Sequence, residues 1–323
     1  MPNPAEITAF TGTVEIKRNG QQSWEQVSVG TKIVLGTLLR KKSGATVKIR
    51  CGNGTPSEPV PDDLLVGLRY ICPTQVMSPG DPRIPYIISP RDTLILTDTP
   101  ILRWNAAADA SSFTVTVRGR ELEWAKQVSR EEVCHDNRCE FVYPGEPPLQ
   151  PDVSYKLVVE ADTGRNSNEE TALGFKLIDA EQAETVQALA QNIQEQDLSD
   201  LLKALALANL YADQNLVALA IETLEAFIKD VEAAGVFNQP AELSAVYTQL
   251  GELYRWIGLF REAEVQYQKL VALAEVEVGE VRWSLGKRKE AIDSLEKAKA
   301  IYEELRDKQR VSELEERLTE MNG

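Results

Sequence analysis

Several features that would indicate an enzyme or a membrane protein are missing. No run of about 18 apolar residues occurs, so we expect no membrane-spanning helix. His135 is the single histidine, so a Ser-His-Asp, Cys-His or two-histidine metal centre has almost nothing to build on. Glycine-rich phosphate loops and HExxH are also absent. We expect no catalytic residues, no cofactor and no metal site.

Positive charge is scarce, above all toward the C-terminus. The chain has 35 Lys+Arg against 50 Asp+Glu and a net charge of −15. Residues 179–323 alone hold 15 basic against 28 acidic side chains. Because an acidic surface repels phosphate backbones, we expect no nucleic-acid partner.

Cysteine is also scarce, and its placement is informative. The four cysteines fall into two pairs before residue 140, Cys51 with Cys72 and Cys134 with Cys139. This distribution favours two disulfides and an oxidising compartment, although four reduced, partly buried thiols are the alternative. The four residues between Cys134 and Cys139 suit a hairpin disulfide, whereas a zinc site would lack an obvious fourth ligand.

The N-terminal residues carry no secretion signal. The segment Met-Pro-Asn-Pro-Ala-Glu has neither a basic nor an apolar region of the kind that a signal peptide needs. We expect either a cytoplasmic protein or a mature segment whose leader was replaced by a methionine.

Residues 1–80 show the alternation of a small all-β domain. Apolar and polar residues alternate over 13–18, and Asn19-Gly20 follows as a hairpin signal. A second alternation runs over 45–51 and predicts that Val47, Ile49 and Cys51 face inward. The order Gly12-Thr13-Val14, Trp24, Val27, Gly30-Thr31-Lys32-Ile33 and Gly36-Thr37-Leu38-Leu39 resembles the FecR-type domain, with Gly-Thr where that family usually has Gly-Asp. The resemblance implies a binding module of the bacterial envelope.

Residues 81–178 are predicted to form a second β-domain. The prolines at 79, 82, 85 and 90 indicate an extended linker. Beyond it, short alternating segments around Trp104, at 112–118, 155–161 and 173–178, resemble an immunoglobulin or fibronectin type III sandwich. This resemblance is to an architecture and implies no activity.

Residues 179–323 change to helical periodicity and contain repeats. One copy comprises Tyr247, Leu250, Gly251, Tyr254, Gly258, Ala263, Tyr267 and Leu270, which resembles the tetratricopeptide repeat (TPR) of about 34 residues. An earlier copy runs from Ala204 to Phe227, and a partial one includes Gly286, Ala291, Leu295 and Ala298. In this pattern Gly251 and Ala263 permit close helix approach and Tyr254 and Tyr267 fill the space between hairpins.

Three irregularities of the array are predicted as well. A longer loop is expected at 235–240, and the helices near 262–285 are expected to run together. The segment 292–321 is expected to form one capping helix, and residues 181–195 a helix before the first repeat. The predicted fold class is therefore two small all-β domains followed by an α-helical TPR-like array.

The resemblance to TPR arrays implies a protein-binding concave face lined by the first helix of each hairpin. The lining positions that we single out are Asn209, Asp213, Gln249, Glu252, Arg255 and Trp256. Ordinary exposed helix is the alternative interpretation. Leu205 and Thr248 stand where a clamp for a C-terminal carboxylate would need basic residues, so an extended or helical partner segment is favoured.

The functional hypothesis is a non-catalytic interaction scaffold of the bacterial envelope, periplasmic or extracellular. The array would bind a protein partner, and the β-domains a further envelope component. The alternatives are a cytoplasmic regulatory adaptor and a cell-wall or glycan-binding protein that acts through the β-domains, for which Trp24 is a candidate.

Overall fold

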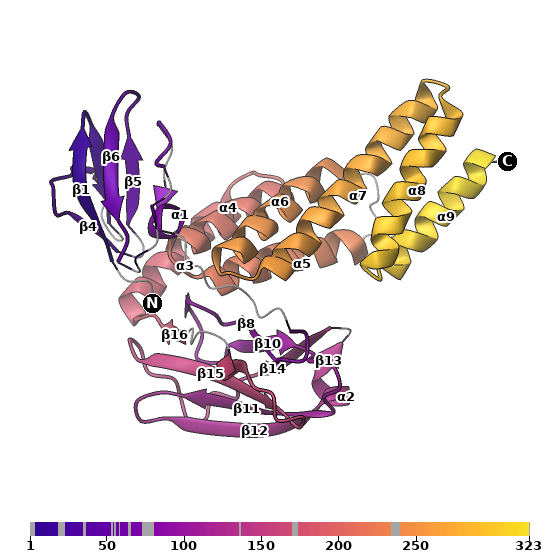
Figure 1. The fold of residues 1–323 in the computed structure, drawn as a ribbon. Helices are drawn as coiled ribbons and strands as arrows, with labels where there is room; N and C mark the ends of the chain where they lie inside the picture. Colours follow the sequence, from indigo (N-terminus) through magenta and orange to yellow (C-terminus); the bar gives the residue numbers. More distant parts are fainter. Residues whose placement is uncertain are drawn as a thin grey trace. The chain divides into compact units, whose positions relative to one another are not determined.

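The computed structural model has small antiparallel β-sheets in its N-terminal half and an array of helices after them, as the sequence predicts (Figure 1). It describes residues 4–18, 23–34, 37–52, 54, 56–57, 59–63, 66–72, 81–135, 137–169, 174–233 and 240–322. The predicted turn at Asn19-Gly20, Gly36, Pro79 and the loop 235–239 lie outside these residues.

Two compact units make up the chain. The first comprises Met1–Thr223 and Trp256–Leu259, and the second Leu224–Arg255 and Phe260–Gly323. The three-domain division at residues 80 and 178 stays a prediction.

The N-terminal part consists of short strands in two small sheets. One sheet has the order β4-β1-β6 and the other β3-β2-β5-β7. The strands are β1 (Ala5–Thr11), β2 (Val14–Lys17), β3 (Glu25–Gln26), β4 (Lys32–Ile33), β5 (Leu38–Lys41), β6 (Thr46–Arg50) and β7 (Val66–Gly67), followed by helix α1 (Leu68–Ile71). As predicted, β6 turns Val47 and Ile49 toward the core, and Cys51 after it is buried and bonded to Cys72.

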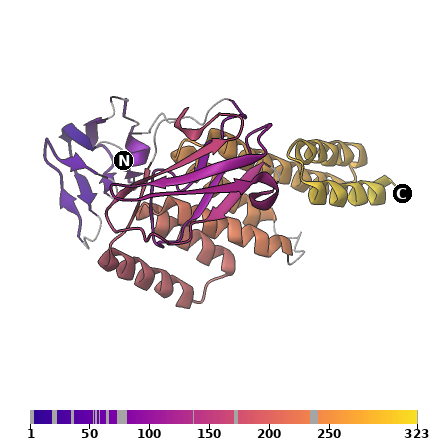
Figure 2. The ribbon, with the colours of Figure 1, turned by 90° about the horizontal axis from the view of Figure 1, so that it is seen from below.

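The second β-part is a two-layer sandwich. Its sheets have the orders β13-β14-β10-β8 and β12-β11-β15-β16-β9, and all pairings are antiparallel except β16 with β9. The strands are β8 (Ile87–Ser89), β9 (Thr93–Ile95), β10 (Ile101–Asn105), β11 (Ser112–Arg118), β12 (Glu123–Ser129), β13 (Cys134–His135), β14 (Arg138–Val142), β15 (Ser154–Ala161) and β16 (Gly174–Leu177), with helix α2 (Arg130–Val133). Trp104 and Phe113 pack edge to face in the core between the layers. Figure 2 looks onto the β12-β11-β15 side of the sandwich.

The predicted hairpin disulfide joins β13 to β14. Cys134 and Cys139 are register partners on these antiparallel strands, and their Cα atoms are 3.9 Å apart. The described residues include no free cysteine, so both predicted bridges are present.

Helices follow from Ala180 to the C-terminus. They are α3 (Ala180–Glu195), α4 (Asp200–Asp213), α5 (Val217–Ala233), α6 (Pro240–Trp256), α7 (Phe260–Ser284), α8 (Arg288–Glu304) and α9 (Lys308–Asn322). The helix expected before the first repeat is α3, and the merged helix expected over 262–285 is α7, which has 25 residues. Gly258 and Gly286 form the turns on either side of α7 with positive φ.

The single capping helix expected over 292–321 is wrong, because the chain turns between α8 and α9. Arg306 has φ 59°, a left-handed conformation that ends α8. The carboxylate of Asp307 then accepts a hydrogen bond from the amide of Arg310 at 3.2 Å, which caps the start of α9. Sequence periodicity did not reveal this break, because both helices carry the same spacing of apolar residues.

Close packing between α6 and α7 occurs at the predicted glycine. A Cβ atom on Gly251 would lie 2.6 Å from Cε1 of Tyr267, so only glycine leaves room for the ring. The hydroxyl of Tyr254 donates to Glu225 of α5 at 2.6 Å. Tyr254 thus connects α6 to the preceding helix α5, whereas Tyr267 packs on Gly251 within the α6–α7 pair and not, as predicted, between hairpins.

Within the first unit, the sandwich donates hydrogen bonds to two turns between helices. The Oγ1 of Thr93 donates to the carbonyl of Asn215 at 3.0 Å, in the turn between α4 and α5. Arg91, which is only 1% exposed, donates from Nε to the carbonyl of Ile257 at 2.9 Å, in the turn after α6. Asn209 and Asp213, on α4, are exposed.

Candidate protein-interaction face

The predicted partner-binding residues of α4 are exposed. Asn209 and Asp213 lie one helical turn apart, which places their side chains on the same side of α4. Although Asp213 is exposed, the packed protein around its carboxyl group raises its pKa by desolvation.

The predicted residues of α6 form a polar cluster with a tyrosine of α7. Glu252 accepts a hydrogen bond from Nη2 of Arg255 at 2.6 Å and another from the hydroxyl of Tyr267 at 3.1 Å. Glu252 and Arg255 are both about half exposed. The hydrogen bond to Glu252 raises the pKa of Arg255, and burial raises the pKa of Tyr267. The cluster offers a partner one anion and one cation in fixed positions.

The remaining predicted residues are less exposed. Gln249 is half-buried on α6, one turn before the Glu252–Arg255 pair. Trp256 is half-buried at the end of α6 and belongs to the first unit, next to the turn that Arg91 holds. The structure thus brings Glu252 and Arg255 into direct contact and places Trp256 beside an internal contact of the chain.

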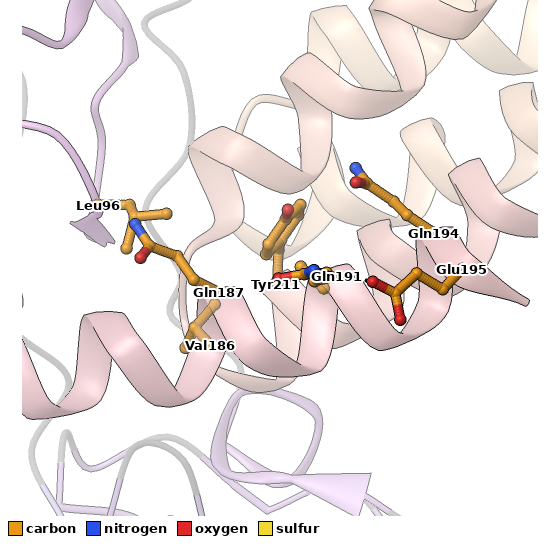
Figure 3. A pocket seen from close by; sticks show the side chains of 8 residues that line it. Leu96, Val186, Gln187, Gln191, Gln194, Glu195 and Tyr211 are labelled. Atoms are coloured by element: carbon orange, nitrogen blue, oxygen red, sulfur yellow. Dashed lines mark hydrogen bonds between the residues drawn. The ribbon is translucent and has the colours of Figure 1, made fainter.

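A pocket that the sequence did not reveal lies between α3 and α4 (Figure 3). Its volume is about 430 Å³, and its lining comprises Leu96, Val186, Gln187, Ala190, Gln191, Gln194, Glu195 and Tyr211. Figure 3 shows the Tyr211 ring standing toward α3, with the long polar side chains of α3 around it. The partly apolar setting of the hydroxyl raises the pKa of Tyr211 by desolvation.

This pocket combines an apolar floor with an amide-rich rim. Leu96, Val186 and Ala190 provide apolar surface, and Gln191 donates to Glu195 across one helical turn at 2.8 Å. This lining suits a side chain of a bound peptide better than a charged metabolite, because it offers amide groups and only one carboxylate. The signal in the sequence is Tyr211 itself, a large aromatic residue that shares the pocket with the small side chain of Ala190.

Other candidate features of the described residues give no chemical site. None of their His, Cys, Asp and Glu residues cluster in a way that could hold a metal ion. The helices that the structure describes include none that is long and apolar enough to cross a membrane. In the N-terminal domain, the guanidinium of Arg40 lies 4.0 Å from the centre of the Trp24 ring, so one face of this indole is already covered.

Comparison with known proteins leaves the chain without an assigned family. No model of a known protein family matches it, and no curated protein was found to be similar. The resemblances to FecR-type domains, to immunoglobulin-like sandwiches and to TPR repeats therefore stay predictions from sequence motifs.

Proposed function

We propose that the protein is a non-catalytic interaction scaffold that binds a segment of another protein on the exposed side of α6. The observation that supports this most is the Glu252, Arg255 and Tyr267 cluster, an ion pair held in place by a neighbouring tyrosine on an exposed helix. Preorganised charges of both signs on rigid helices are typical of recognition surfaces.

The partner segment is expected to carry positive charge. Residues 179–323 hold 28 acidic against 15 basic side chains. A basic, extended or helical segment therefore fits better than an acidic one.

The bacterial envelope is the compartment that we favour. Two disulfides tie the β-domains, and disulfides of this kind persist in oxidising compartments. The resemblance of residues 1–80 to FecR-type domains supports the same location. A cytoplasmic adaptor is the alternative, and it requires that the four cysteines are reduced in the cell.

The test is affinity capture from an envelope extract with the full chain as bait. Wild type is compared with Arg255→Ala and Trp256→Ala together. We expect the double variant to lose the proteins that wild type recovers, because hot-spot residues of these types carry much of an interface's energy. Circular dichroism and urea denaturation of the variant establish that it is folded.

Arg18→Ala is the matched control. Arg18 is exposed and paired with Glu25 in the N-terminal domain, much as Arg255 is paired with Glu252 on α6. The control should recover the same proteins as wild type. Identical recovery by wild type and by the Arg255→Ala, Trp256→Ala variant would rule out this face, and capture that depends only on residues 1–178 would point to the glycan-binding or β-domain alternative.

A further inference from the structure

An exposed apolar stripe runs along the C-terminal half of α7 and ends at Leu285, the first residue after this helix. It consists of Val271, Ala274, Val278, Val281 and Leu285, which follow one another at intervals of three, four, three and four residues. The exposed fractions are 52% for Val271, 42% for Val278, 58% for Val281 and 65% for Leu285, and Ala274 is exposed as well. We call these five residues the α7 stripe.

The stripe is exposed because α7 is longer than the helix before it. The first half of α7 packs on α6 through Tyr267 and Gly251, but α6 has 17 residues and α7 has 25. Figure 1 shows the C-terminal part of α7 extending beyond the start of α6, with α8 returning beside it. The helix α8 contacts another side of α7, where Leu295 packs against Gly279.

The spacing of the stripe matches one kind of partner, another α-helix. Apolar residues that alternate at three and four residues form the seam of a coiled coil, in which each side chain enters a gap on the facing helix. The exposed area of the five residues is on the order of 300 to 400 Å², the size of patches that mark interaction sites. One side of a standard interface buries about 800 Å², of which about 450 Å² is apolar. The stripe supplies most of that apolar share.

We propose that the α7 stripe is a self-association surface, on which a second copy of the chain packs its own α7 in the antiparallel direction about Val278. The stripe is nearly symmetric about this residue, since Val271 and Leu285 each lie seven positions away. A twofold interface requires a surface that complements itself in this way. Antiparallel packing then places Val271 of each copy near the C-terminal part of the other stripe.

Charges beside the stripe favour the antiparallel direction. On one flank, Glu275 and Arg282 lie three and four residues from Val278, so antiparallel packing would bring each near the opposite charge of the second copy. Both side chains are held by the hydroxyl of Ser294, at 2.9 Å and 2.6 Å. Parallel packing would instead bring together the exposed cations Lys287 to Lys289 of both copies.

On the other flank of the α7 stripe, a negative charge weakens the antiparallel dimer. Glu277 is exposed and lies next to Val278, so the twofold axis brings it close to its own copy. Two carboxylates at this distance repel each other. We therefore expect a reversible dimer at moderate concentration that Glu277→Gln strengthens.

Sedimentation of the full chain tests the proposal. The average mass should rise from 35.9 kDa toward twice that value as the concentration increases from about 1 µM to about 1 mM. Val278→Glu should stay monomeric over this range, and Glu277→Gln should dimerise at a concentration several times lower than wild type. The control Val29→Glu changes another valine, which is 65% exposed in the N-terminal domain, and should behave as wild type.

Cross-linking tests the direction. Under mild oxidation, Val278→Cys should form a covalent dimer by itself. Val271→Cys and Leu285→Cys should cross-link efficiently only when the two variants are mixed. Cross-linking of Leu285→Cys with itself would show parallel packing and overturn the proposal. The proposal would also be overturned if the chain stays monomeric up to about 1 mM, or if Val278→Glu leaves the dimer intact. The α7 stripe would then be a binding surface for a helix of another protein.

Discussion

Replacement of Gly251 by alanine should destabilise the chain when Tyr267 is present and stabilise it when residue 267 is alanine. In an ordinary helix interior, alanine is more favourable than glycine by about 1 kcal/mol. Here the new Cβ would lie 2.6 Å from Cε1 and 2.7 Å from Cζ of Tyr267. The ring has to move, and its hydrogen bond to Glu252 is then lost.

The magnitude follows from these opposing effects. Overpacking typically costs about 1 to 3 kcal/mol, and a hydrogen bond to a charged group contributes about 1.5 kcal/mol or more. Set against the gain of about 1 kcal/mol in helix propensity, Gly251→Ala should lower the free energy of unfolding by about 1.5 to 3.5 kcal/mol. In a Tyr267→Ala background the clash is gone, and the same change should raise stability by about 1 kcal/mol.

Urea denaturation followed by helical circular dichroism measures all four members of this double-mutant cycle. Gly279→Ala is the matched control, because its Cβ would meet the fully buried Leu295 at 2.9 Å and the Ala291 carbonyl at 3.3 Å, so it should destabilise the chain equally with and without Tyr267. If Gly251→Ala stabilises the chain equally with and without Tyr267, the packing argument for the α6–α7 hairpin is refuted.

Three further predictions concern other parts of the molecule. Arg91→Ala removes a buried guanidinium and leaves a turn carbonyl without its donor, so the free energy of unfolding should fall by about 2 to 4 kcal/mol. The control is Arg83→Ala, at an exposed arginine. If the two variants unfold at the same urea concentration, the role of Arg91 is contradicted. Burial raises the pKa of Tyr302 from 10.0 to about 12, so the unfolded chain ionises first as the pH rises. Stability should therefore fall by about 2 to 3 kcal/mol between these pH values in wild type, but by clearly less in Tyr302→Phe. The Cys51–Cys72 bridge closes a separation of 21 residues, so replacing both cysteines by serine should cost about 3 kcal/mol, measured as a shift in the denaturation midpoint.

Local sequence patterns determine much of the fold by themselves. The change from alternating strands to helical periodicity near residue 179, the hairpin disulfide at Cys134 and Cys139, and the close approach at Gly251 all depend on residues near one another in sequence. Such features can be predicted because turn geometry and helix spacing are properties of short segments. The polar pair Glu252 and Arg255 belongs to this class, since one helical turn brings the two together.

Tertiary structure alone decided the features that depend on distant segments or on where helices end. Arg91 is buried against a carbonyl 166 residues further along the chain, and nothing in the local sequence around it specifies that partner. The break at Arg306 determines that α9 is a separate helix, and the shortness of α6 determines that the α7 stripe is exposed. The apolar spacing of Val271 to Leu285 is visible in the sequence, but a covered and an uncovered helix face have the same spacing. Only the packing of neighbouring helices distinguishes them, because burial is a property of what lies opposite a side chain.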